Sequence, residues 1–243
     1  MQKPKKVLIF SVTYFPNLVG GDVVAVKEIT DRVSPEYFEF HLITIGFDKK
    51  LPKYQKMGNV HVYRVGFTGE MKSVADSYKF PLHYNKYLFT VLAPIKALSL
   101  SRRIKFDLVW SIMANYAGFA ALFFKFLKPK TPFLLTLQEG DPFDYTKKRV
   151  GPLFPLFKMI FTKADSIQAI SKYLADWGRG MGHRGEIDIV PNGVDIKKFD
   201  IEISKQERLK IRQELGLVEG DIALVTTSRL VVKNGVGDVV EAL

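Results

Sequence analysis

Short apolar runs alternate with segments of helical periodicity along most of the chain. The runs are rich in branched side chains, and continuous runs of this kind are typical of strands buried on both faces of a parallel sheet. They are Val7–Val12, Phe38–Ile45, Val60–Val65, Leu108–Ser111, Phe133–Leu137, Ser166–Ile170 and Ile187–Val190.

Between these runs, apolar residues recur at the spacing of one helical face. Val23, Val26, Ile29 and Val33 have this spacing. Strands that alternate with helices form crossover units. The pattern therefore predicts an α/β fold with a mostly parallel, doubly wound, Rossmann-like sheet. Further helices are expected at Tyr84–Arg103, Tyr116–Leu127 and Lys172–Gly178.

The pattern changes after the turn signal Pro191-Asn192-Gly193. We predict a first domain at residues 1–195, followed by a linker and the incomplete start of a second Rossmann-like domain at 196–243. The expected elements there are a charged helix at Lys197–Leu215, a buried strand at Ala223–Thr227 and a helix that begins at Asp238. A helix that halts after six residues buries little surface, so the second domain is expected to be truncated.

Composition narrows the class of protein. The 243 residues are 47% apolar and 13% aromatic, which excludes a disordered chain. The absence of cysteine excludes disulfides and thiol chemistry and fits a reducing cytoplasm. The longest apolar stretch, Ala114–Leu127, contains Lys125 and is shorter than the roughly 20 residues of a membrane-spanning helix. We expect a soluble, cytoplasmic protein.

The net charge of +11 is concentrated in the first domain. Residues 201–243 hold 6 basic and 7 acidic side chains, and the other 30 and 18 precede them. An excess of this kind favours an anionic partner, such as phosphate groups or a membrane surface, although a solvated basic surface is the alternative. The basic residues are scattered and do not form a stripe among aromatic residues, so nucleic acid is not an expected partner.

The loop after the first predicted strand, residues 14–22, is a candidate phosphate-binding loop. Gly20 and Gly21 allow a ligand to approach the backbone, and the free N–H groups at a helix start favour an anion. Asp22 is expected to cap that helix. The alternative is a tight turn without a ligand.

A second candidate loop, Gln138-Glu139-Gly140-Asp141, follows the strand Phe133–Leu137. Carboxylates at the end of a parallel strand can bind sugar hydroxyls or a metal, or act as a base. The alternative is a pair of solvated loop acids.

A third loop, 228–235, follows the predicted strand Ala223–Thr227 and contains Arg229 and Lys233. Two cations four residues apart could hold a diphosphate and neutralise the charge that develops as it leaves. Ordinary surface charge is the alternative.

Other features point less clearly to a site. The segment Gly151–Phe161, preceded by Lys147, Lys148 and Arg149, could contact a membrane, but a helix packed in the core is the favoured interpretation.

No metal-ligand spacing exists among the four histidines, which are His41, His61, His83 and His183. His41 and His61 lie in predicted strands and are expected to be structural.

Four ordered segments resemble the retaining, nucleotide-sugar-dependent glycosyltransferases of family 4, which have the two-domain GT-B fold. These segments are the opening strand with Pro16 and Gly20-Gly21, then Asp165–Leu174, Ile189–Asp195 and Ser228–Gly235. The resemblance implies a sugar transferase that retains the anomeric configuration and uses a nucleotide sugar as substrate without a further cofactor or metal. A module that binds an anionic glycan or a lipid headgroup without catalysis is the alternative from another class.

The resemblance also implies roles for residues of this chain. Arg229 and Lys233 would be catalytic and would hold the donor diphosphate, with Gly20, Gly21 and Asn192 as further donor or phosphate contacts. The acceptor, anionic or lipid-linked, would bind mainly to the first domain, which leaves open a peripheral contact with the inner face of the membrane.

Two departures from the family pattern matter. Similar enzymes commonly carry a histidine in the loop where this chain has Gln138 and Glu139, so these two residues and Asp141 are candidate sugar or acceptor contacts. The family's pair of glutamates belongs to the second domain beyond Leu243. We therefore expect the 243 residues alone to bind donor weakly and to turn over little.

Overall fold

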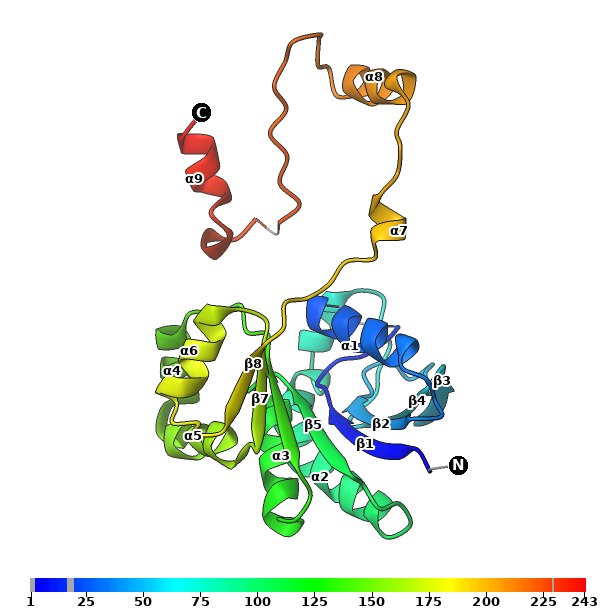
Figure 1. Ribbon diagram of the computed structural model, residues 1–243, viewed down its shortest axis with the longest axis vertical. Coiled ribbons are helices and arrows are strands. Elements are labelled where there is room, and N and C mark those ends of the chain that lie inside the picture. The colour runs from blue at the N-terminus through cyan, green and yellow to red at the C-terminus, as the bar shows by residue number, and fades with distance from the viewer. Residues whose placement is uncertain (1–2, 17–19, 229) are drawn as a thin grey trace. The chain divides into compact units, whose positions relative to one another are not determined.

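Among the described residues, eight strands form one sheet, and all of them belong to the first part of the chain (Figure 1). The computed structural model describes residues 3–16, 20–228 and 230–243, except for the side chain of Lys233. Contacts divide the chain into two compact units, Met1–Gly193 and Val194–Leu243. Each unit is described by itself.

The strand order is β3-β4-β2-β1-β5-β6-β7-β8. All neighbouring pairs are parallel except β3 and β4. The predicted α/β class with a mostly parallel, Rossmann-like sheet is therefore confirmed. The strands are β1 (Lys5–Phe10), β2 (Phe38–Ile45), β3 (Tyr54–Met57), β4 (Val60–Val65), β5 (Leu108–Ile112), β6 (Phe133–Leu137), β7 (Ser166–Ala169) and β8 (Glu186–Ile189).

Apolar cores cover both faces of this sheet, because successive strand residues point to opposite sides. Leu8 and Phe10 of β1 join the core that contains helix residues such as Phe89 and Phe157. Val7 and Ile9 join the core on the other face, which contains Val23 of α1. The helices of this unit are α1 (Gly21–Arg32), α2 (Asn85–Ser101), α3 (Tyr116–Leu127), α4 (Phe143–Val150), α5 (Phe154–Lys163) and α6 (Lys172–Gly180), with 3-10 turns η1 (Val74–Tyr78), η2 (Leu82–Tyr84) and η3 (Gly151–Leu153).

The segment Gly151–Phe161 forms η3 and most of α5, and its apolar side chains enter the core. Phe157, Ile160 and Phe161 are all buried. The favoured interpretation of this segment as a core helix is confirmed. No helix among residues 3–16, 20–228 and 230–243 is long and apolar enough to cross a membrane.

The second unit is built of short helices. They are α7 (Ile196–Phe199), α8 (Lys205–Glu214), η4 (Val232–Asn234) and α9 (Val236–Glu241). The prediction of a buried strand at Ala223–Thr227 is wrong: its described residues form no strand, and Val225 is 81% exposed. A strand needs a neighbour to satisfy its backbone groups, and residues 194–228 and 230–243 contain no other strand to pair with.

Candidate functional site

The loops that follow β1, β5 and β6 meet at one edge of the sheet. These three strands are consecutive neighbours and run parallel, so their carboxyl ends lie side by side. Ligands of open α/β sheets bind beyond this edge. The sheet topology therefore brings together two of the three loops that the sequence singled out.

The loop after β1 leads directly into α1. Gly20 is the N-cap of this helix and Gly21 is its first residue, so their backbone lies at a helix start with free N–H groups. A Cβ atom at Gly21 would meet nothing within 4 Å, so this backbone is open to an approaching group. Asp22 is the second residue of the helix and does not cap it, contrary to expectation, because the N-cap is Gly20, two residues earlier.

Glu139 follows β6, and its carboxyl group is buried at the edge of the sheet. Its Oε1 accepts a hydrogen bond from the backbone N–H of Ala114, in the loop after β5. Its Oε2 is buried and has no hydrogen-bond partner among the described residues. A buried polar atom without a partner is costly, so this oxygen is well placed to bind a group from outside the chain.

Burial raises the pKa of Glu139 to about 7. Hydrogen bonds from the backbone N–H groups of Ala114, Glu139 and Gln138 favour the ionised form and oppose this shift. The negative charge of Asp22, in the first turn of α1, adds to it. A carboxyl group with this pKa can accept a hydrogen bond from a hydroxyl group or donate one near neutral pH.

Sequence reasoning missed the turn that holds Glu139. Met113 has a positive φ of 70°, which is uncommon for a residue other than glycine, and it precedes Ala114. Asn115 then caps α3, and its side chain accepts a hydrogen bond from the N–H of Ala117 at 2.8 Å. An asparagine before an apolar periodic segment is a recognisable cap signal, but no sequence signal links Ala114 to Glu139.

Gln138 and Asn192 lie together at the same edge. Gln138 Nε2 donates a hydrogen bond to Asn192 Oδ1 at 3.3 Å. The structure thus joins a predicted sugar contact to a predicted phosphate contact. Asp141 is half-buried in the bend before α4, two residues beyond Glu139.

The predicted catalytic cations lie in the second unit. Arg229 lies outside the described residues. Lys233 belongs to the turn η4, and Gly235 adopts a left-handed conformation with φ of 66° before α9. The roles of both cations stay predictions.

His41 and His61 are placed in β2 and β4, as expected. Their rings stack with centroids 4.8 Å apart, and His41 Nε2 contacts Glu39 Oε1 at 2.6 Å. The hydroxyl of Tyr54 lies 2.9 Å from His61 Nδ1. Burial lowers the pKa of both histidines, opposed by the charge of Glu39. In the described part of the chain, no group of three His, Asp or Glu side chains could hold a metal ion.

Comparison with known proteins identifies a family. The model of Glycosyltransferase Family 4 matches residues 19–198. An uncharacterized glycosyltransferase of Methanocaldococcus jannaschii is 20% identical over 244 residues, which cover 98% of this chain and 59% of that protein. The chain thus spans well under two thirds of this curated relative.

Solved structures show the same fold at low sequence identity. Sucrose-phosphate synthase from Thermosynechococcus elongatus superposes with a TM-score of 0.62 and 15% identity, over 88% of this chain and 53% of that one. An Anabaena protein in complex with UDP and glucose has a TM-score of 0.54 and 15% identity, over 87% of this chain and 50% of that one. These likenesses agree with the GT-B type of fold implied by the sequence.

Proposed function

Because the chain belongs to glycosyltransferase family 4, we propose that the whole protein transfers a sugar from a nucleotide-sugar donor to an acceptor with retention of anomeric configuration. The family match over residues 19–198 carries this proposal. It also favours an enzyme over a module that only binds a glycan or a lipid headgroup. Since the chain spans 59% of its curated relative, the reaction is proposed for the whole protein.

The donor diphosphate would lie against the start of α1, formed by Gly20 and Gly21, where the backbone at Gly21 is open. As the family resemblance implies, Arg229 and Lys233 would bind phosphate groups of the donor and stabilise the nucleoside diphosphate as it leaves. Because cationic side chains and a helix dipole can neutralise the diphosphate charge, the reaction would need no metal ion. The Anabaena neighbour, which is in complex with UDP and glucose, supports a donor of this class.

Hydroxyl groups of the transferred sugar or of the acceptor would meet the loop after β6. Glu139 Oε2 is buried without a partner among the described residues, so it would gain a hydrogen bond from such a hydroxyl group. Gln138 and Asp141, in the same loop, would supply further polar contacts to these hydroxyl groups, while Asn192, hydrogen-bonded to Gln138, would contact the donor phosphates. The basic first unit favours an acceptor that is anionic or lipid-linked, held at the inner face of a membrane.

The reaction is tested with the full-length protein and a panel of nucleotide sugars. We expect transfer or slow hydrolysis of at least one donor, with the anomeric configuration retained in the product as read by NMR. Arg229→Ala should lower turnover by roughly 100-fold or more, because it removes charge that stabilises the leaving group. Arg208→Ala, an exposed arginine of α8, is the matched control and should keep its activity.

Three results would overturn the proposal. They are the absence of reaction with every donor, inversion at the anomeric carbon, and undiminished turnover by a folded Arg229→Ala variant.

A further inference from the structure

The side of α2 that faces away from the sheet is apolar and exposed. Tyr84, Tyr87, Val91 and Ile95 lie along it and are 47 to 57% exposed, whereas the opposite side buries residues such as Phe89 in the core. The turns before the helix continue the surface with Tyr78 and Phe80, which are 73% and 81% exposed. We call Tyr78, Phe80, Tyr84, Tyr87, Val91 and Ile95 the α2 face. Exposed apolar surfaces of this extent usually have a partner.

The charges around the α2 face are positive and mostly unpaired. Residues 77–106 contain six lysines and arginines and no acidic residue. Lys79 does form an ion pair, because its Nζ lies 2.7 Å from Asp76 Oδ1. Lys86 instead lies over the ring of Tyr87, 5.0 Å from its centroid.

Further cations gather where α2 ends. Arg102, Arg103 and Lys105 line a hollow of about 510 Å³ together with Lys128 and Lys130, which follow α3. None of these five side chains forms an ion pair within the described residues. Asp107 also lines this hollow, but its carboxylate accepts a hydrogen bond from the backbone N–H of Lys6.

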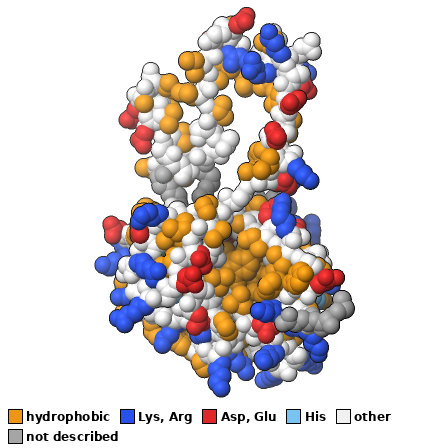
Figure 2. All heavy atoms as spheres, viewed as in Figure 1, with side chains coloured by type: hydrophobic (Ala, Val, Ile, Leu, Met, Phe, Trp, Pro, Cys, Tyr) orange, Lys and Arg blue, Asp and Glu red, His pale blue; other side chains and the backbone are white. Residues whose placement is uncertain are grey.

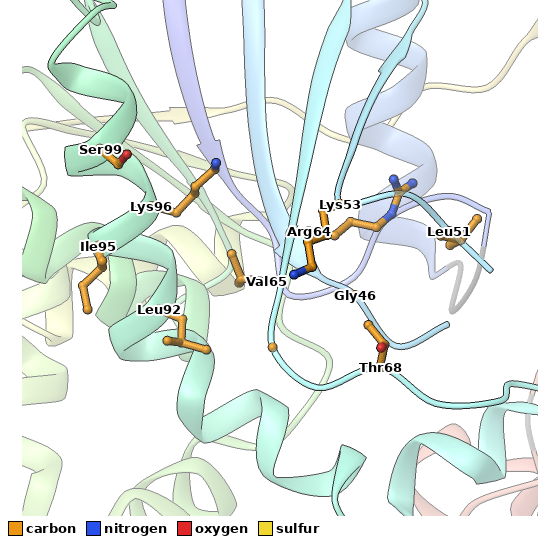
Figure 3. A pocket seen from close by; sticks show the side chains of 11 residues that line it. Gly46, Leu51, Lys53, Arg64, Val65, Thr68, Leu92, Ile95, Lys96 and Ser99 are labelled. Carbon is orange, nitrogen blue, oxygen red and sulfur yellow. The ribbon is translucent and has the colours of Figure 1, made fainter. Parts of the chain in front are cut away.

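A groove of about 380 Å³ runs between α2 and the end of β4. Figure 3 shows Leu92, Ile95 and Lys96 of α2 on one side of this groove, and Val65 and Thr68 on the other. The groove continues the α2 face toward the sheet with the same combination of apolar and cationic side chains.

We propose that the α2 face docks on a lipid bilayer that contains anionic lipids. Tyrosine and phenylalanine side chains would enter the headgroup region, and the unpaired lysines and arginines would lie near lipid phosphates. Charge complementarity selects an anionic bilayer over a neutral one. The aliphatic residues Val91 and Ile95 add apolar contact that a nucleic acid or a polyanionic glycan would not need.

The α2 face begins close to the candidate site. The ring of Tyr87 lies 5.5 Å from that of Tyr116, the first residue of α3. Tyr116 is two residues from Ala114, whose N–H binds Glu139. A lipid-linked acceptor in the bilayer would therefore present its headgroup near Glu139; this link rests on the proposed function, whereas the docking itself does not.

Co-sedimentation with vesicles tests the docking. The 243-residue chain is mixed with vesicles of phosphatidylcholine alone or with 30% phosphatidylglycerol added. We expect binding to the anionic vesicles at least about ten-fold stronger than to the neutral ones, and weaker at high salt. Equal binding to both kinds of vesicle, or no binding to either, would overturn the proposal.

Two variants locate the surface, each with a matched control. Phe80→Ser/Tyr84→Ser/Tyr87→Ser removes apolar contacts, and Arg102→Gln/Arg103→Gln/Lys105→Gln removes three charges. Each should lower anionic-vesicle binding about ten-fold or more with unchanged circular dichroism. The controls Val24→Ser/Ile29→Ser/Tyr37→Ser and Lys147→Gln/Lys148→Gln/Lys163→Gln change equally many exposed residues elsewhere and should bind like the parent chain.

The proposal fails if the controls lose as much binding as the α2 variants. It also fails if the chain binds an oligonucleotide or a sulfated glycan tightly and ignores anionic vesicles. Turnover of a nucleotide sugar with a water-soluble acceptor, measured on the full-length protein, should be the same in all four variants. A protein that binds vesicles but has no transferase activity would contradict the proposed function and leave the docking standing.

Discussion

Glu139 shows how one residue's environment gives it a chemical property that its type alone lacks. As a free side chain it would be ionised at neutral pH. At the end of β6 its carboxyl is buried, one oxygen is bound to the N–H of Ala114, and the other has no partner among the described residues. The result is a group that exchanges its proton near neutral pH, in the loop where hydroxyl groups are proposed to bind.

The raised pKa of Glu139 predicts a pH-dependent stability. Between its ordinary value of 4.5 and about 7, the folded chain binds more protons here than the unfolded chain does. Stability from this group is therefore full at low pH and falls as the pH rises through this window. Above about pH 7, the resulting decrease in the free energy of unfolding reaches about 3 kcal/mol. Glu139→Gln removes this loss, so the variant should be more stable than the parent at pH 8.

Urea unfolding at pH 5, 6.5 and 8 measures this effect. The stability advantage of Glu139→Gln should be largest at pH 8 and shrink toward pH 5. Glu219→Gln, an exposed glutamate of the second unit, is the control and should change little at any of the three pH values. An advantage that does not vary with pH would contradict the raised pKa.

At the scale of elements, aromatic content alone does not tell which of two aromatic-rich segments is buried and which is exposed. The segment 151–161 and the segment 78–87 are both rich in aromatic residues and lie beside lysines. In the fold, Phe157 and Phe161 of α5 are 2% and 0% exposed, while Phe80 before α2 is 81% exposed. The difference arises because α5 packs against α3 and, through Phe157 and Phe161, against Trp177 of α6. No element among the described residues buries Phe80 in this way.

The burial of α5 predicts a large cost for removing one of its rings. Phe157 packs against Phe161 and Trp177, with ring centroids 5.5 Å and 6.2 Å away. Phe157→Ala should lower the free energy of unfolding by about 3–5 kcal/mol, because it leaves a cavity in the core. Leu153→Ala, 57% exposed in the neighbouring turn, should cost less than about 1 kcal/mol. Chemical denaturation of both variants checks this, and equal costs would contradict the packing.

Strand prediction succeeded where pairing supported it. The bounds of β2, β4 and β6 agree with the predicted runs residue for residue, since their mostly apolar and aromatic sequences suit the interior of the sheet. The edge strand β3, with the polar sequence Tyr-Gln-Lys-Met, gave no apolar signal and was missed. The run at 223–227 had the apolar signal, but residues 194–228 and 230–243 offer no strand to pair with it, so the sequence alone predicted a strand that did not form.

At the scale of the whole molecule, the two units differ in how much they bury. The first contains both apolar cores, whereas the described residues of 194–243 include no buried one. Figure 2 shows lysine and arginine side chains spread around the visible face of the first unit and not gathered in one stripe.

The difference in burial predicts where a protease cuts the 243-residue chain. Exposed backbone with few tertiary contacts opens readily and is cleaved first. Trypsin should cut first after Lys197, Lys198 or Lys205 and leave a resistant product that contains the first unit. Mass spectrometry of a time course identifies the cuts. Early cleavage within α3 or α5 would contradict the prediction, because these helices are packed in the core.

Three features follow from the sequence itself: the α/β class, the approximate positions of most strands, and the membership of a glycosyltransferase family. They could be predicted because periodicity and motifs depend on neighbours along the chain. The tertiary structure decided which residues meet: Glu139 with Ala114, Gln138 with Asn192, and Tyr87 with Tyr116. Those contacts depend on strand order and helix packing, which bring together residues far apart in sequence and so determine which side chains are buried, paired or exposed.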